Sequence, residues 1–195
     1  MSEPLPFYVR GMWGMGDNIY QRPFVRRLAQ HAPVYLETPW PELYEDIPNV
    51  HFVRGNRALR TQLKNMALQK SERWKIPPRF HVSKQISYNM RAGSIIDDMM
   101  LSFGLRGLPG FEPQLDLPPV PYWQKEPWAT ISKPIALIRP VTIRTEWTNL
   151  ARNPLPEYIS QISIELMKTH YVIAVADIVP RFETLVGNMP AFHMG

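Results

Sequence analysis

A glycine-rich stretch near the N-terminus carries the residue types and the spacing that could do chemistry. A β-favouring run, residues 7–9, leads into three glycines and an acid–amide pair: Gly11, Gly14, Gly16, Asp17 and Asn18. Glycine lets a loop approach a ligand closely, because it reaches positive φ and has no Cβ. A carboxylate or an amide after such a turn can act on a substrate or cap the first turn of a helix. Both roles stay open at this point.

The spacing of the glycines does not match the common nucleotide motifs. Counted from Gly11, they fall at offsets 0, 3 and 5, whereas the dinucleotide fingerprint Gly-x-Gly-x-x-Gly needs offsets of about 0, 2 and 5. The stretch also lacks the Lys-Ser or Lys-Thr pair of a P-loop. The local pattern therefore predicts a strand, a tight turn and a helix, and the motif alone names no ligand.

Other reactive residues give weaker signals. Asp97 and Asp98 are adjacent, and neighbouring residues on a helix point in different directions, so they predict an acidic patch rather than a metal pair. The five histidines are scattered without the spacing of metal ligands. The sequence contains no Gly-x-Ser-x-Gly motif of a serine hydrolase. We therefore expect neither a metal site nor a serine nucleophile.

Composition and charge narrow the class of protein. The chain has 195 residues, 45% of them hydrophobic, which is enough for a globular core. It has no cysteine and no apolar run near the roughly 18 residues of a membrane span. Residues 1–6 have neither the basic start nor the apolar stretch of a secretory signal. Lys and Arg exceed Asp and Glu by 22 to 17, but they are dispersed and form no nucleic-acid track. We expect a cytoplasmic protein that binds no nucleic acid and has at most a peripheral membrane association.

The pattern of apolar residues predicts an α/β protein that begins with a β-α-β unit. Strands are expected at 7–9, 33–38 and 50–53, with a helix between the first two that has Pro23 near its first turn. The run 57–74 predicts the longest helix. Residues 80–88 alternate like a strand, although a helix stays open there. Ser94 is expected to cap a helix that Gly104 ends.

Prolines divide the chain into two parts. Of the 21 prolines, many cluster at 109–134, so we expect a first domain at 1–125, a proline-rich linker at 126–133 and a second domain at 134–195. The second part predicts a strand at 135–139, a polar loop at 140–154, a helix at 156–168 and a strand at 171–175. The helix should bury Tyr158, Ile159, Ile162, Leu166 and Met167. We expect residues 182–195 to be too few for a complete second sheet.

These features together resemble the heptosyltransferase family, which transfers heptose from ADP-heptose to lipopolysaccharide and belongs to the two-domain GT-B glycosyltransferases. Gly16-Asp17 matches the Gly-Asp turn of that family, and 34–36 matches its second strand. The stretch from 136 to 157 matches the opening of its second domain, with Leu155-Pro156-Glu157 in place of Trp-Pro-Glu. The resemblance implies a Rossmann-like doubly wound parallel sheet, followed by a partial second Rossmann-like domain.

The resemblance also implies roles for individual residues. Asp17 would be the general base that takes the proton of the acceptor hydroxyl, with Gly14, Gly16 and Asn18 in the acceptor-side loop. The donor diphosphate would be bound in the second domain by hydroxyl and guanidinium groups: Thr142, Arg144, Thr145 and Arg152. The alternatives are a helix cap for Asp17 and solvated surface charges for the arginines.

The implied reaction is an inverting sugar transfer that needs no metal and no cofactor. Its partners would be a nucleotide-diphospho-sugar, with an ADP-sugar favoured, and a glycan or lipid-linked glycan acceptor. The family's second domain continues beyond the point that matches residue 195, so a non-catalytic glycosyltransferase-like module and a fragment without its donor half are the alternatives. An unrelated phosphate- or nucleotide-binding α/β enzyme is a third possibility.

Overall fold

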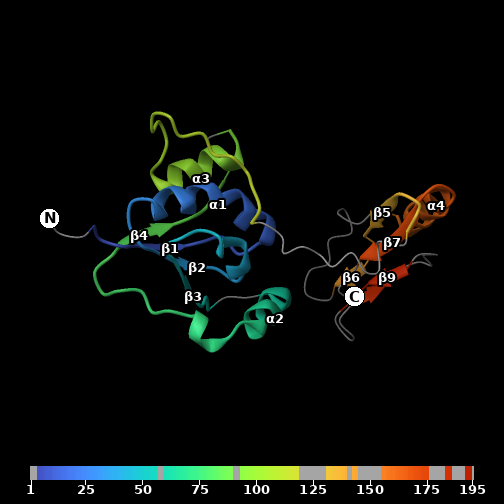
Figure 1. The fold of residues 1–195 in the computed structure, drawn as a ribbon, viewed down its shortest axis with the longest axis horizontal. Helices are drawn as coiled ribbons and strands as arrows, with labels where there is room; N and C mark the ends of the chain where they lie inside the picture. The colour runs from blue at the N-terminus through green and yellow to red at the C-terminus, as the bar shows by residue number, and fades with distance from the viewer. Residues whose placement is uncertain are drawn as a thin grey trace. The chain divides into compact units, whose positions relative to one another are not determined.

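The structure of the chain is a computed structural model that divides it into two compact units, residues 1–121 and 122–195 (Figure 1). It describes residues 4–56, 59–89, 93–118, 131–139, 142–144, 155–175, 183–185 and 192–194. Most of the expected linker, 126–133, lies outside these ranges. Each unit is described by itself below.

The first unit is built on a four-stranded parallel sheet with the order β3-β2-β1-β4. The strands are β1 (Phe7–Arg10), β2 (Val34–Glu37), β3 (Val50–Val53) and β4 (Val82–Gln85). β1 lies inside the sheet with β2 and β3 to one side and β4 to the other, so the strand order reverses beside β1. This is the α/β, Rossmann-like arrangement that the sequence predicted, and it confirms 80–88 as a strand region.

One face of this sheet carries the core of the unit. Val9, Val34 and Leu36 are fully buried there, because helices α1 (Met15–Ala29) and α3 (Ile95–Phe103) pack over it from the same side (Figure 1). Phe24 of α1 and Phe103 of α3 stack with their ring centroids 5.3 Å apart. Burying an apolar side chain of this size contributes about 1.5–3 kcal/mol, so this layer is the core of the unit.

Helix α1 begins earlier than the sequence indicated. Its N-cap is Gly14, and no side chain caps its first turn, so neither Asp17 nor Asn18 has the capping role that the sequence left open for them. Asp17 lies in the first turn instead, where a carboxylate interacts favourably with the positive end of the helix dipole. Pro23 consequently lies inside the helix and not in its first turn.

The later helices follow the predictions in part. The Ser94 hydroxyl accepts a hydrogen bond from the backbone N–H of Asp97, and Gly104 ends α3 with φ of 69°, as the capping pattern predicted. The helix within the run 57–74 is shorter than expected: the run contains α2 (Arg60–Leu68) and the 3-10 turn η2 (Ser71–Arg73). The longest described helix is therefore α1, with 15 residues.

The opposite face of the first sheet is not covered in this way. Helix α2 lies beyond β3, away from α1 and α3 (Figure 1), and its side chains bond to loops: Gln62 donates to the backbone oxygen of Trp13 and Asn65 to that of Pro39. The strand residues that face this side alternate with the buried ones, and none of them is buried: Tyr8, Arg10, Tyr35, Glu37, His51, Val53, Ser83 and Gln85. Parallel sheets are usually buried on both faces, so this open face is unusual.

The second unit contains a parallel sheet of order β5-β7-β9 and an antiparallel pair, β6 and β8. The strands are β5 (Ile135–Ile138), β6 (Thr142–Arg144), β7 (Tyr171–Val175), β8 (Glu183–Leu185) and β9 (Phe192–Met194). β6 lies in the stretch that was expected to be a loop. The sequence did not predict β8 and β9, because neither three-residue run has a distinct apolar pattern.

Helix α4 (Pro156–Met167) packs on the second sheet through fewer residues than predicted. Ile159 and Leu166 contact the small core of Ile138, Val172 and Ala174, as expected. The predicted burial of three other side chains was wrong, since they are 59%, 51% and 42% exposed in turn: Tyr158, Ile162 and Met167. The fully buried Ser163 occupies the position facing inward, so the helix is rotated relative to its most apolar stripe.

Among the described residues, no helix combines the length and the apolarity that crossing a membrane requires.

Candidate functional site

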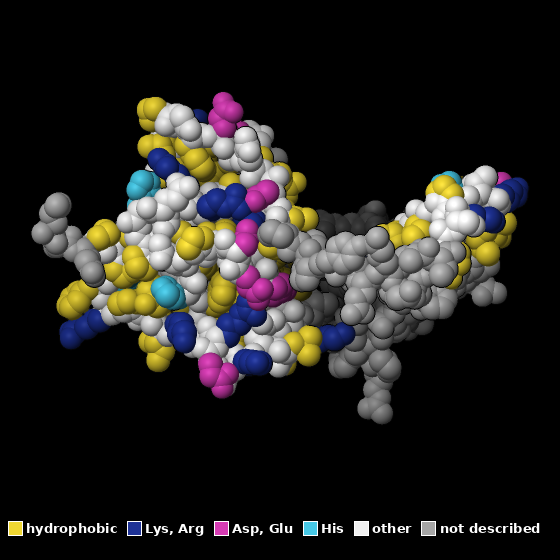
Figure 2. Space-filling view, viewed as in Figure 1, with side chains coloured by type: hydrophobic (Ala, Val, Ile, Leu, Met, Phe, Trp, Pro, Cys, Tyr) yellow, Lys and Arg dark blue, Asp and Glu magenta, His cyan; other side chains and the backbone are white. Residues whose placement is uncertain are grey.

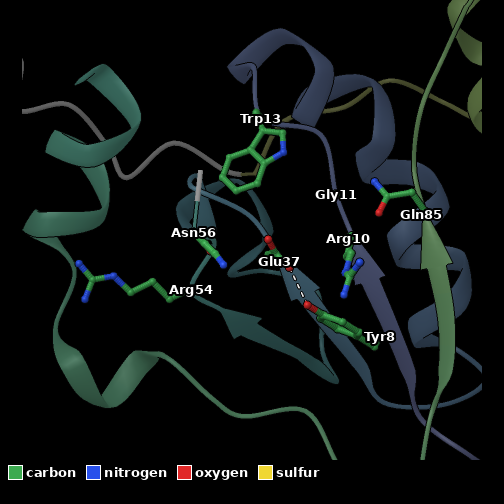
Figure 3. Close-up of a pocket in the computed structure, with 8 residues that line it drawn as sticks. All are labelled: Tyr8, Arg10, Gly11, Trp13, Glu37, Arg54, Asn56 and Gln85. Carbon is green, nitrogen blue, oxygen red and sulfur yellow. Dashed lines mark hydrogen bonds between the residues drawn. The ribbon is translucent and has the colours of Figure 1, made fainter. Parts of the chain in front are cut away.

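A pocket of about 580 Å³ opens at the carboxyl end of the first sheet, on its open face (Figure 3). Ligands of open α/β sheets bind outside the carboxyl ends of their strands, and every strand of this sheet supplies or precedes a lining residue. The lining residues are Tyr8, Arg10, Gly11, Trp13, Glu37, Arg54, Asn56 and Gln85.

The strand register brings the polar side chains of the pocket together. Arg10 is the direct neighbour of Glu37 on β2 and of Gln85 on β4. The hydroxyl of Tyr8 donates a hydrogen bond of 2.6 Å to Oε2 of Glu37, and the Arg10 guanidinium lies 5.6 Å from the centroid of the Tyr8 ring. Burial and the hydrogen bond to Glu37 raise the pKa of Tyr8 above its ordinary value, so Tyr8 is a neutral donor at physiological pH.

The loop after β1 fixes Trp13 at the rim of the pocket. The backbone oxygen of Trp13 accepts hydrogen bonds from the indole of Trp40 at 2.9 Å and from the Gln62 amide at 2.8 Å. The Trp13 ring lies against Gly55, where an added Cβ would come within 2.3 Å of the indole. Glycine at position 55 is therefore required for this position of the ring.

Gly11 also lines the pocket at a position where a side chain would not fit. Its N–H donates to the backbone oxygen of Glu37 at 3.1 Å, and a Cβ there would come within 2.9 Å of that same oxygen and 2.8 Å of the Gln21 amide. The first glycine of the motif thus serves the close approach of β1 to β2.

The pocket offers two cations and one acid to a ligand. Arg10 and Arg54 are exposed, and the acid, Glu37, already accepts the hydrogen of Tyr8. Asn56 and Gln85 add amide groups that donate and accept hydrogen bonds, and Trp13 adds an apolar ring. This combination suits a small molecule that carries hydroxyl groups and a negative charge.

Asp17 lies at the same edge of the sheet but does not line this pocket. It is partly exposed, and its Oδ1 accepts a hydrogen bond of 3.1 Å from the hydroxyl of Tyr88. Its Oδ2 lies over Gly14, since a Cβ on that glycine would be 2.5 Å away. Tyr88 follows β4 and Asp17 lies in the first turn of α1, which follows β1, so the contact joins the segments after β1 and β4, between which the strand order reverses. Such a switch point is the usual ligand crevice of this architecture.

Asn18 has a structural environment. It is fully buried, its amide donates to the backbone oxygens of Met12 and Gly14, and its Oδ1 accepts from Thr38 at 2.7 Å. These bonds hold the turn against β2, which leaves the side chain no surface for a ligand. Gly16 lies open: apart from its neighbours in the chain and the backbone of its own helix, no atom lies within 4 Å of the position of a Cβ.

The expected donor residues are described only in part. Thr142 and Arg144 lie on β6, where they are the register partners of Leu185 and Glu183. Thr145 and Arg152 lie outside the described residues.

Sequence reasoning missed most of the pocket. Arg10, Glu37 and Arg54 each stand at or just after the end of an expected strand. Charged residues at the carboxyl ends of neighbouring parallel strands are a usable signal, but it becomes specific only when the strand order is known.

In the parts of the chain that the structure describes, no group of three or more His, Asp or Glu side chains could hold a metal ion.

Comparisons of the chain with protein-family models, with curated proteins and with solved structures find no match. The fold is therefore what is shown: an α/β fold with a Rossmann-like four-stranded parallel sheet and a second, smaller parallel sheet.

Proposed function

We propose that this chain is a glycosyltransferase of the heptosyltransferase-like GT-B type. It would move a sugar, with heptose as the first candidate, from a nucleotide-diphospho-sugar to a glycan acceptor of the lipopolysaccharide type. The observation that carries the proposal is the position of Asp17: a partly exposed carboxylate beside the Gly14–Gly16 turn, at the point where the strand order reverses. The resemblance of the sequence to the family supports the same residue.

The chemistry needs a base at this place. In an inverting transfer, the acceptor oxygen attacks the anomeric carbon of the donor while the bond from that carbon to the diphosphate breaks. The proton of the acceptor hydroxyl must leave as the new bond forms, and a carboxylate within hydrogen-bond reach can take it. The hydrogen bond from Tyr88 occupies Oδ1 of Asp17, so Oδ2 is the atom that we assign to the proton transfer.

The pocket would then bind the acceptor. Its amides suit hydroxyl groups, Trp13 suits the apolar face of a sugar ring, and Arg10 and Arg54 suit a carboxylate or phosphate on the sugar. The leaving diphosphate gains negative charge in the transition state and requires cationic and hydroxyl donors. We assign that role to the second unit: Thr142, Arg144, Thr145 and Arg152.

The test is a calorimetric titration of the whole chain with ADP-, UDP- and GDP-sugars, followed by an assay of nucleotide release with lipopolysaccharide core oligosaccharide. We expect saturable binding of one nucleotide class, with an ADP-sugar first. Asp17→Asn should keep that binding and lose at least a hundredfold in turnover. The matched control is Glu72→Gln, which neutralises an exposed carboxylate on η2 and should leave turnover unchanged. Full turnover in Asp17→Asn would remove Asp17 from the reaction.

A non-catalytic glycan-binding module is the second candidate. The pocket supports this candidate, because Asp17 is not among the residues that line it. In that case the chain would bind the oligosaccharide, bind no nucleotide-sugar, and bind equally well as the Asp17→Asn variant.

A further inference from the structure

Aromatic rings gather on the open face of the first sheet. We call this group the ring face: Tyr8, Tyr35, His51 and His81. The rings of Tyr35 and His51 lie 4.8 Å apart between centroids, and those of Tyr8 and His81 meet edge to face at 5.3 Å. All four are partly exposed. A parallel sheet that leaves such rings in contact with solvent is unusual, and a ligand would account for it.

Most neighbours of the rings are polar. Ser83 is the register partner of Tyr8, and the next row on the same open face is Val53, Glu37, Arg10 and Gln85, of which only Val53 is apolar. A surface of this composition lacks the apolar core that protein interfaces bury. It does match a sugar, whose C–H face packs on an aromatic ring while its hydroxyl groups bond to amides, hydroxyls and guanidinium groups.

The ring face continues directly into the pocket. Tyr8 belongs to both, and Tyr35 and His51 extend the surface across β2 and β3. Neighbouring strands are about 4.8 Å apart, so the row from Tyr8 to His51 spans about 10 Å, which is more than one sugar ring. A ligand that fills both regions must therefore be longer than a monosaccharide.

The charge at the pocket end selects for an acidic ligand. Arg10 and Arg54 are exposed cations, and the carboxylate that lines the same pocket, Glu37, accepts a hydrogen bond from Tyr8. On the side of the first unit seen in Figure 2, Lys and Arg side chains are scattered among other types and form no continuous track. Two cations at one end of the binding surface suit a glycan with an acidic group at that end better than a uniformly charged polymer.

We propose that the ring face and the pocket together bind a linear oligosaccharide with at least one acidic sugar. The acidic sugar lies between Arg10 and Arg54, and the following sugars lie on Tyr8, Tyr35 and His51. Insofar as this oligosaccharide is the acceptor, the inference rests on the proposed transfer, and it specifies that the acceptor is a chain of several sugars.

The experiment measures binding of the whole chain to oligogalacturonates of one to six sugars, with maltohexaose as the neutral control and oligothymidylate as the nucleic-acid control. We expect the affinity to rise at least tenfold from one sugar to four. The double variant Tyr35→Leu, His51→Leu should lose at least fivefold for the four-sugar ligand and nothing for the single sugar. Tyr158→Leu is the matched control, since it removes an exposed tyrosine of the second unit, and it should bind like the parent chain.

Three results would overturn the proposal. One is an affinity that does not depend on ligand length. Another is tighter binding of oligothymidylate or of maltohexaose than of the acidic hexamer. The third is no saturable binding of any oligogalacturonate by a chain that unfolds cooperatively. The assay contains no nucleotide-sugar, so a failure of the transfer proposal, seen as no donor binding, leaves this result unaffected. Should the double variant unfold, Tyr35→Phe with His51→Gln keeps one ring and should lose affinity for the long ligand only.

Discussion

Arg22 of α1 donates from its Nε to Oδ1 of Asp116, 94 positions along the chain, at 3.3 Å. The Arg22 side chain is fully buried and also pairs with Asp46. Arg26, one turn further along α1, pairs with Asp116 as well. The segment after α3 is thereby attached to the first helix, next to the 3-10 turn η1 (Pro41–Tyr44), whose Leu43 backbone oxygen Arg22 also contacts.

Replacing Arg22 by Met should destabilise the first unit. The change removes a buried cation, leaves Asp46 without its principal partner and leaves Asp116 with Arg26 alone, so we expect a loss of about 2–4 kcal/mol. Urea unfolding followed by circular dichroism measures it. Arg26→Met is the control: this side chain is 36% exposed, and its loss should cost at most about 1 kcal/mol. Equal effects of the two variants would contradict the structural role of Arg22.

The same cluster predicts a loss of stability in acid. Hydrogen bonds from Arg22 hold the pKa of Asp46 below its ordinary value of 3.8. Burial raises the pKa of Asp116, but hydrogen bonds from Arg26 and Arg22 lower it by more. A lowered folded-state pKa stabilises the protein above the ordinary pKa and ceases to do so as the pH falls through the folded value. The melting temperature should therefore drop below about pH 4, and less steeply in Asp116→Asn.

Tyr44 predicts a loss of stability in alkali. Its hydroxyl is buried between Gln21, which donates to it at 2.7 Å, and the backbone oxygen of Asn18. Burial raises the pKa of Tyr44 well above its ordinary value of 10.0. The stabilisation is complete below that value and falls as the pH rises above it, because the unfolded chain ionises first. Melting curves from pH 8 to pH 11.5 should fall more steeply for the parent chain than for Tyr44→Phe, which costs about 1–3 kcal/mol at neutral pH.

The two glycines beside Asp17 should behave differently. Alanine at position 14 would put a Cβ 2.5 Å from Oδ2 of Asp17 and turn the carboxylate away, so sugar transfer should fall at least tenfold while stability changes by less than about 1 kcal/mol. Alanine at position 16 meets nothing and lies inside α1, so it should add about 0.5–1 kcal/mol. Nucleotide release and urea unfolding are the two measurements. A Gly14→Ala variant with full activity would argue against proton transfer to Oδ2.

The sequence predicted those elements whose signals are local. The alternation of apolar residues indicated β1 to β4, and Ser94 with Gly104 marked both ends of α3, since caps act within one turn. The start of α1 could not be read in the same way. Asn18 looks like a cap in the sequence, but its side chain is used by Thr38 and Tyr44, which lie at least 20 positions away.

The residues of the candidate site also differ in whether a local sequence signal could predict them. Asp17 was visible because a glycine turn and an acid stand together in the chain. The pocket was not visible, because Arg10, Glu37 and Gln85 become neighbours only through the order and register of three strands. If the register of one of these strands shifted by one residue, its pocket side chain would point into the core instead. Register is a property of the packed sheet, which the amino-acid pattern of a single strand does not specify.

One face of the first sheet forms the core and the other carries the candidate site, so substitutions on the two faces have different consequences during evolution. Substitutions on the Val9 and Leu36 side alter the buried core and are restricted by folding. Substitutions among the partly exposed residues on the Tyr8 and Tyr35 side alter little of that core. Lineages could therefore exchange these residues and acquire new ligand preferences at little cost in stability, while the same backbone is inherited unchanged.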